Sequence, residues 1–252
     1  MVSLLQSIIL SIIQGITEWL PISSSGHLAL LHNFFGFQNL PFDVFLHFAS
    51  ILAVIVVFWK DIIRLLNFKE ENIKYILKLL VALIPAGIIG ILFKEQIENF
   101  FSSFFYLGMF FMISGVIIYS TKFSIPKKEK PNFLDSIIIG FFQALAILPG
   151  VSRSGATISS GLIRGVKKEE AVKFSFLLAI PIVLGASLLE VKDLVMENID
   201  LSILLISFIV TFVVSLFVIK VLLRIIKDRK FYIFGIYDFI LGLIVFISSF
   251  FL

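Results

Sequence analysis

Two short stretches place phosphate-binding or reactive side chains inside otherwise apolar sequence. The stretch Pro149–Thr157 reads Pro-Gly-Val-Ser-Arg-Ser-Gly-Ala-Thr and follows an apolar run that begins at Ile137. Glycines let backbone N–H groups approach a ligand, hydroxyls cap helix starts, and a guanidinium matches phosphoryl oxygens. A helix kink whose arginine snorkels to the membrane surface is the structural alternative. The pattern favours a phosphate site formed by Gly150, Ser152, Arg153, Ser154, Gly155 and Thr157.

The other stretch, Gln14–His27, holds the groups that could move protons. Glu18 is the one formally charged side chain among residues 1–42, and Gln14 lies one helical turn before it. Pro21 should end that helix and the following serines should cap the next one, in which Ser24 and His27 would share a face. Structural pairing with Arg153 is the alternative role for Glu18. The candidate catalytic residues are Glu18, Ser24, His27 and Arg153, supported by Gln14, Ser23 and Ser25.

These residue types suit phosphoryl transfer. Ser24 is the candidate nucleophile, with His27 as its base and Glu18 orienting His27 or holding a metal; direct attack by water, with His27 as base, stays open. Mg²⁺ or Ca²⁺ is the candidate cofactor, bound through Glu18 and the substrate's phosphates. The absence of cysteine excludes thiolate metal sites, and no pattern indicates an organic cofactor. We expect His32, Asp43 and His47 at the outer interface, and we assign Asp238 no role.

The elements that must position these residues are membrane helices. Hydrophobic residues make up 59% of the 252-residue chain, and its mean hydropathy is +1.08, which indicates a multi-pass membrane protein. Adding 129 to Gln14, Ser23, Ser25 and Gly26 gives Gln143, Ser152, Ser154 and Gly155, so the two halves repeat. Matching interruptions in two halves indicate a site at their junction, midway through the membrane.

Loop charges predict the topology. Lys and Arg cluster at 60–78, 122–130, 164–173 and 220–230, whereas 94–99 and 190–200 are mostly acidic; the basic loops should be cytoplasmic and the acidic ones external. The segment between 122–130 and 164–173 therefore should not cross, and the apolar residues 137–148 would span only about 18 Å as a helix. We predict a re-entrant hairpin there, a second one in the first half, and both termini outside.

The predicted fold is an all-α integral membrane domain over 1–252, formed by two repeats of inverted topology. Each repeat has one re-entrant helical hairpin and three transmembrane helices. The first repeat, 1–121, has its hairpin at about 1–39 and spans at about 40–60, 76–94 and 100–121. The second, 132–252, has its hairpin at about 132–166 and spans at about 170–190, 200–222 and 231–251.

The two motifs resemble those of the undecaprenyl-diphosphatase family, the bacitracin-resistance phosphatases of bacterial plasma membranes. The resemblance covers essentially the whole chain and rests on Gln14–His27 and on the long PGxSRSxxT motif, here Pro149–Thr157. The family has Glu or Gln at the first motif position; Gln14 excludes a two-carboxylate metal site from that motif. The resemblance implies hydrolysis of a C55 polyprenyl diphosphate to the monophosphate and phosphate, which recycles the cell-wall lipid carrier for peptidoglycan synthesis.

A polyprenyl-phosphate transporter or flippase is the alternative function, because inverted repeats with broken helices are typical of transporters. Clustered Ser, His, Glu and Arg favour hydrolysis instead. The expected partners are the lipid diphosphate, bacitracin competing for it, membrane lipid and, as a candidate assembly, a second copy of the chain in a homodimer; no nucleic acid is expected. The active site should face the outside of the plasma membrane.

Overall fold

The structure, a computed structural model, describes residues 2–36, 39–67, 69–101, 103–196, 199–227 and 230–251. These residues are almost entirely helical, with no strand among them and one isolated bridge between Lys128 and Val166. The predicted all-α architecture is confirmed. Each predicted hairpin consists of two short helices joined by a break. They are α1 (Leu4–Thr17) with α2 (Ser24–Phe35), and α8 (Phe133–Leu145) with α9 (Arg153–Ile163).

Five helices in the described part of the chain are long and apolar enough to cross a membrane. They are α3 (Leu40–Val57), α5 (Glu70–Leu92), α7 (Phe104–Tyr119) extended by the 3-10 turn η1 (Ser120–Phe123), α10 (Lys168–Met196) and α11 (Leu201–Lys227). The sixth predicted span, 231–251, is shorter than expected. Its helix α12 (Ile233–Ser248) has 16 residues, which correspond to about 24 Å of length.

Two further helices occupy segments for which the sequence predicted only loops. α4 (Trp59–Leu65) follows α3 directly, and α6 (Lys94–Phe101) occupies the acidic segment after α5. α6 is amphipathic, and the side chain of Ile97 on its apolar face is buried against the protein. Both are short helices at the ends of longer ones. Parts of the predicted loops 190–200 and 220–230 lie outside the described residues.

The helices of the two halves correspond in register. Adding 129 to the bounds of α7 gives the bounds of α12, and the same shift carries the first residue of α2 onto the first residue of α9. The capping bonds repeat as well: Gly26 N donates to Ser23 Oγ at 3.3 Å, and Gly155 N donates to Ser152 Oγ at 3.0 Å. The sequence repeat is therefore also a repeat of local structure.

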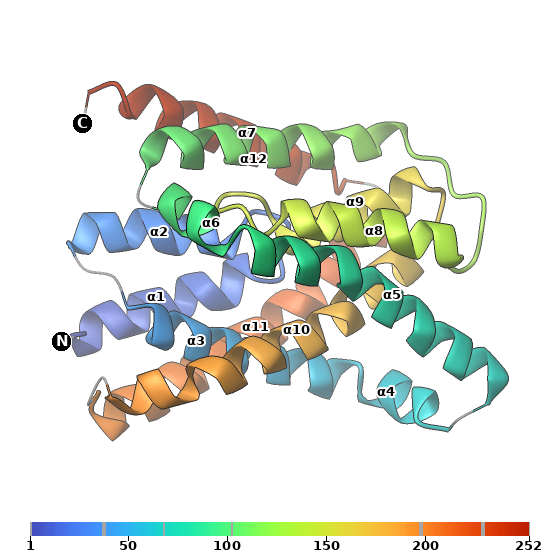
Figure 1. Ribbon diagram of the computed structural model, residues 1–252, viewed down its shortest axis with the longest axis horizontal. Helices are drawn as coiled ribbons and strands as arrows, with labels where there is room; N and C mark the ends of the chain where they lie inside the picture. Colours follow the sequence, from blue (N-terminus) through green and yellow to red (C-terminus); the bar gives the residue numbers. More distant parts are fainter. Residues whose placement is uncertain are drawn as a thin grey trace.

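The hairpin of each half packs against a long helix of the other half (Figure 1). Outside its own hairpin α1 packs chiefly against α11, and α8 packs chiefly against α5, while α7 pairs with its own counterpart α12. The contacts follow the same register: Thr211 Oγ1 donates to Ser11 O at 3.3 Å, and a Cβ added to Gly140 would lie 2.6 Å from Ala82 O. Each hairpin thus contacts the opposite half extensively, and the two breaks meet.

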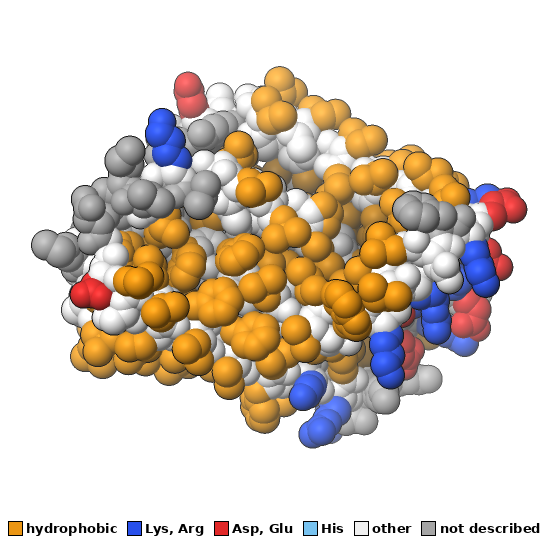
Figure 2. Space-filling model, turned by 90° about the horizontal axis from the view of Figure 1, so that it is seen from below, with side chains coloured by type: hydrophobic (Ala, Val, Ile, Leu, Met, Phe, Trp, Pro, Cys, Tyr) orange, Lys and Arg blue, Asp and Glu red, His pale blue; other side chains and the backbone are white. Residues whose placement is uncertain are grey.

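The surface agrees with a membrane protein. Hydrophobic side chains cover most of the face shown in Figure 2, and most of its Lys and Arg side chains lie toward the end that carries α4 in Figure 1. The beginning of α1 and the end of α12 both lie at the opposite end, some way apart (Figure 1). The largest hydrophobic core consists mainly of residues from α3, α10 and α11, and it includes Trp19 from the break in the first hairpin.

Candidate active site

The break in the first hairpin runs from Glu18 to Ser23, between α1 and α2. Ser23 has φ +64°, a left-handed conformation, and it is the one non-glycine residue with positive φ in the described chain. Its side chain caps α2 by accepting from Gly26 N. Strained backbone of this kind concentrates at functional sites, and here it lies directly before Ser24.

The break in the second hairpin lies between α8 and α9. Gly150 has φ +101°, and a Cβ there would lie 2.8 Å from Leu107 O, so this turn requires glycine. Ser152 then caps α9, whose first residue is Arg153. The loop therefore places Arg153 at the start of a helix, where it reaches Glu18 in the first break.

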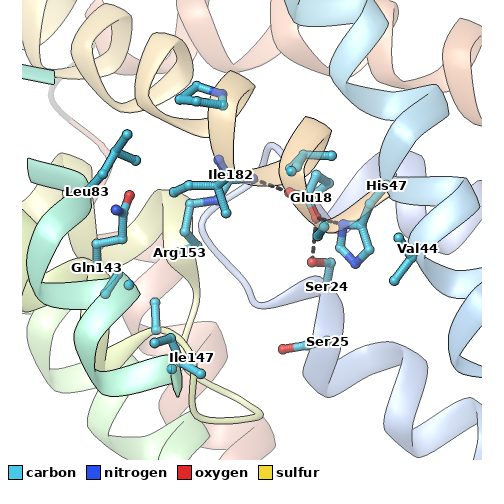
Figure 3. Close-up of a pocket in the computed structure, with 18 of the residues that line it drawn as sticks. Glu18, Ser24, Ser25, Val44, His47, Leu83, Gln143, Ile147, Arg153 and Ile182 are labelled. Atoms are coloured by element: carbon cyan, nitrogen blue, oxygen red, sulfur yellow. Dashed lines mark hydrogen bonds and ion pairs between the residues drawn. The ribbon is translucent and has the colours of Figure 1, made fainter. Parts of the chain in front are cut away.

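Glu18 is the centre of the cluster formed where the two breaks meet (Figure 3). Arg153 Nη2 pairs with Glu18 Oε1, and Ser24 Oγ donates to Glu18 Oε2 at 2.6 Å. His47 Nδ1 and Gln14 Nε2 lie 2.9 and 3.1 Å from the same Oε2. The carboxyl group is buried, and a buried charge of this kind is tolerated when cations and hydrogen-bond donors surround it.

This cluster lines a cavity of about 670 Å³ that is bounded by α3, α5, α8 and α10. The polar and charged residues that line it are Glu18, Ser24, Ser25, His47, Gln143 and Arg153. Arg153 Nη1 is buried and has no hydrogen-bond partner in the described part of the chain. A guanidinium with one nitrogen paired and the other unsatisfied is suited to an incoming phosphoryl oxygen.

The structure places His27 differently from the prediction that it serves Ser24. Its Nδ1 lies 2.8 Å from Ser23 O, and its Nε2 lies 2.8 Å from Tyr237 OH. Because a carbonyl can only accept, Nδ1 carries the hydrogen, and in the neutral ring Nε2 accepts from the tyrosine. Both ring nitrogens are therefore occupied, and His27 is absent from the lining of the cavity.

His47, from α3, takes the place that the sequence suggested for His27. The sequence prediction placed it at the outer interface, together with His32 and Asp43. The signal that could have identified it is its position as a lone histidine within the apolar span that begins at Val44. A titratable side chain inside a membrane span usually faces the protein interior and serves a function. Asp43 pairs with His32 at 2.7 Å instead of joining the cluster.

Most predicted phosphate-binding side chains make contacts inside the protein. Ser152 Oγ caps α9 by accepting from the amide of Gly155, Ser154 Oγ donates to Leu20 O at 3.3 Å, and Thr157 Oγ1 lies 2.6 Å from Ser175 Oγ. Of the six predicted residues, only Arg153 lines the cavity. The motif therefore mainly builds the turn that presents Arg153.

The predicted supporting residues of the first motif lie close to the site. Gln14 contacts both Glu18 and His47, Ser25 lines the cavity, and Ser23 Oγ lies 3.4 Å from Ser25 Oγ. Gln143, the repeat counterpart of Gln14, also lines the cavity, and its Nε2 donates to the backbone of α5 at 3.2 Å. The repeat therefore brings two equivalent glutamines close to the same cavity.

A resident divalent metal does not fit this donor set. No group of three or more His, Cys, Asp or Glu side chains suitable for a metal occurs among the described residues. Each oxygen of Glu18 already contacts a protein group, Arg153 on one side and Ser24, His47 and Gln14 on the other. A cation at Glu18 would have to displace these contacts and take its remaining ligands from elsewhere.

Comparison with known proteins covers nearly the whole chain. Residues 7–244 match the family described as bacitracin resistance protein BacA, and this range holds both hairpins apart from the first residues of α1. An undecaprenyl-diphosphatase of Halothermothrix orenii is 39% identical over 250 residues, which cover 96% of each chain. One of Methanococcus vannielii is 41% identical over 96% of this chain and 98% of its own. With its two motifs meeting in one cavity and nearly its whole length matched, the chain belongs to the BacA bacitracin resistance family.

Proposed function

We propose that this protein is an integral membrane phosphatase that hydrolyses undecaprenyl diphosphate to the monophosphate and inorganic phosphate. Its relatives along the full length of the chain carry that activity in their names, and the observation that supports it in the site is Arg153 beside Glu18 and Ser24 in one cavity. The reaction regenerates the lipid carrier of cell-wall precursors. It also removes the diphosphate that bacitracin would bind, which accounts for resistance.

We further propose that the two repeats have inverted topology and that the hairpins are re-entrant. Equivalent helices α7 and α12 run antiparallel, since Gly108 lies against Gly242 and Gly115 lies against Gly235. Equivalent helices that run in opposite directions support two halves of opposite orientation. The lysine-rich loops support a cytoplasmic location for the end that carries α4. In this proposal both chain ends lie outside, and the cavity opens to the outer side.

In the proposed reaction Arg153 binds the terminal phosphoryl group. Nη1, which is buried without a partner among the described residues, would donate to a phosphoryl oxygen once the diphosphate enters, while Nη2 stays with Glu18. The guanidinium would stabilise the charge that develops on the transferring group. The apolar walls of the cavity suit the first isoprenoid units of the lipid. A divalent cation that took part in the reaction would be held chiefly by the diphosphate, because both oxygens of Glu18 already contact protein groups.

The proposed nucleophile is Ser24. Its Oγ attacks the terminal phosphorus, its proton passes to Glu18 along the existing 2.6 Å bond, and the bond from phosphorus to the bridging oxygen breaks to release the lipid monophosphate. Water then hydrolyses the phosphoserine to phosphate and free serine. In the alternative, Glu18 takes a proton from a water molecule that attacks phosphorus directly. In either route His47 stabilises Glu18, and His27 holds the loop before α2.

A lipid transporter is the less favoured function, because the curated relatives are diphosphatases. The deciding experiment is phosphate release from undecaprenyl diphosphate by the purified protein in detergent. We expect release by the wild type and none above protein-free micelles for the double variant Ser24→Ala, Arg153→Gln. A folded wild-type protein that releases no phosphate, with or without Mg²⁺, would refute the proposed function.

A further inference from the structure

Asp238 is a buried acid near the middle of α12, in a helix that is otherwise apolar around it. Its side chain is fully buried, and Oδ2 accepts a hydrogen bond of 2.7 Å from Ser114 Oγ on α7. Oδ1 is buried without a hydrogen-bond partner in the described residues. An acid at such a position is costly, so its presence calls for a role that the reaction chemistry above does not supply.

The partner of Asp238 leads to the catalytic arginine. Ser114 Oγ, which donates to Asp238, also accepts a hydrogen bond of 3.1 Å from Ser152 N. Ser152 is the N-cap of α9 and immediately precedes Arg153. The donors run in one direction, from backbone N–H to hydroxyl to carboxyl group, so each bond fixes the orientation of the next.

The helices that carry this chain of bonds are themselves tightly paired. A Cβ on Gly115 would lie 2.7 Å from Gly235 O, and one on Gly242 would lie 2.7 Å from Gly108 O. Backbones this close leave little freedom for one helix to slide along the other. Ser114 is therefore held in register with Asp238 by the pair α7 and α12.

The residue before Asp238 reaches the other hairpin. Tyr237 OH hydrogen-bonds His27 Nε2 at 2.8 Å, and the two rings stack with their centroids 5.9 Å apart. Two consecutive residues of α12 thus contact the two hairpins, one directly and one through Ser114. The pair α7 and α12 is in this way a common support for both breaks.

We infer that Asp238 and Ser114 are positioning residues that hold the turn before α9, so that Arg153 meets Glu18 and the phosphoryl group. The kinetic consequence rests on the proposed function, whereas the position of the turn does not. Loss of Ser114 leaves the Ser152 amide without its acceptor, and loss of Asp238 leaves the Ser114 hydroxyl without the acceptor that orients it. Either change frees the turn. A displacement of about 1 Å at a catalytic group is enough to cost about 10²-fold in rate.

The test compares Asp238→Asn, Asp238→Leu and Ser114→Ala, with Ser215→Ala as the control. Ser215 is a buried serine on α11, outside this chain of bonds. Asn keeps an oxygen acceptor for Ser114 and should retain kcat/KM within about threefold, whereas Asp238→Leu and Ser114→Ala should lower it by about 10- to 100-fold. The double variant Ser114→Ala, Asp238→Leu should be no worse than the poorer single one, because both changes remove the same support.

A second measurement is independent of turnover. The chain has no cysteine, and Val151 lies in the turn, buried at 2% exposure against the cavity. The thiol of Val151→Cys should react with a polar reagent at least about threefold faster when combined with Asp238→Leu or Ser114→Ala, and at an unchanged rate with Asp238→Asn or Ser215→Ala. An inactive wild type would defeat the proposed function and leave this labelling test intact.

Two results would overturn the inference. One is labelling and kinetics for Ser114→Ala that match those of Ser215→Ala. The other is a loss of kcat/KM in Asp238→Asn as large as that in Asp238→Leu. That result would mean that Asp238 acts through its ionisable carboxyl group and not through the hydrogen bond that it accepts from Ser114. If Asp238→Leu does not fold, Ser114→Ala and Asp238→Asn still decide between these outcomes.

Discussion

Replacing Arg153 with lysine keeps the positive charge but removes the planar guanidinium, whose two terminal nitrogens can bind two different groups. In the structure Nη2 pairs with Glu18 while Nη1 is buried without a partner among the described residues. A lysine offers one nitrogen on a flexible stem, and it can serve either Glu18 or a phosphoryl oxygen at its best geometry, not both. The change therefore deletes one preorganised donor to the transferring group.

The expected magnitude follows from that deletion. Loss of one preorganised donor to a developing oxyanion costs about 10²- to 10³-fold in turnover, or about 2.7–4 kcal/mol. We expect Arg153→Lys to lose at least about 10²-fold in kcat, with KM changed less. Folding should be nearly unaffected, because the ammonium can still pair with the buried carboxylate of Glu18 and leaves no buried charge alone.

The assay is steady-state phosphate release in detergent, with thermal unfolding measured on the same samples. Arg164→Lys is the matched control, since Arg164 follows the last residue of the same helix and pairs with Asp135 at 2.9 Å, away from the cavity. Turnover of Arg153→Lys within a few-fold of the wild type, with turnover of Arg164→Lys unchanged, would refute the proposal that Arg153 binds the transferring phosphoryl group. Arg153 would then be a structural partner of Glu18.

Further predictions concern the remaining cluster, the topology and acid stability. Glu18→Gln should lower turnover by at least about 10²-fold and His47→Ala by at least about 10-fold, measured by phosphate release with intact folding as the control; equal loss in His27→Ala and His47→Ala would restore His27 to the proton path. Ser24→Ala should abolish turnover, and near-normal hydrolysis would leave direct attack by water. Single cysteines at positions 128 and 167 should both react from the cytoplasmic side, and labelling from opposite sides would contradict the re-entrant hairpin. Burial of Asp135 tends to raise its pKa, but hydrogen bonds from Asn132, Lys128 and Arg164 outweigh this and lower it. The stability that Asp135 contributes should therefore be present above the ordinary carboxyl pKa of about 3.9 and be lost as pH falls toward the lower folded-state pKa, and thermal unfolding should show a weaker acid dependence in Asp135→Asn.

The sequence predicted the all-helical fold because the signals for helices are strong and local. Apolar length located the spans, and a cap such as Ser152 marks a helix start whatever the rest of the fold does. The register of 129 residues predicted that the breaks correspond, and the helices after them, α2 and α9, begin 129 residues apart. The span at 231–251 was predicted, but the helix α12 is shorter than expected because apolar composition continues past Ser248.

Contacts within the site were predictable only where both residues of the contact belong to one of the two sequence motifs, Gln14–His27 and Pro149–Thr157. Glu18, Ser24 and Arg153 are polar residues at the two breaks, and they come together because the breaks meet. The place of His47 in the cluster and the contact between His27 and Tyr237 were not predicted, because both depend on neighbours distant in sequence. Tyr237 is separated from His27 by 210 positions, and no local pattern in one sequence indicates which face of α12 turns toward α2.

The packing of each hairpin against the opposite half affects the order in which the chain can fold during its synthesis. α1 is synthesised first, yet its main partner outside its own hairpin, α11, begins at Leu201. Contacts between segments so far apart form late and slow folding. Until α11 emerges from the ribosome, the face of α1 that carries Ser11 and Gly15 lacks the helix that covers it. The packing of the first hairpin therefore cannot be completed until most of the protein has been made.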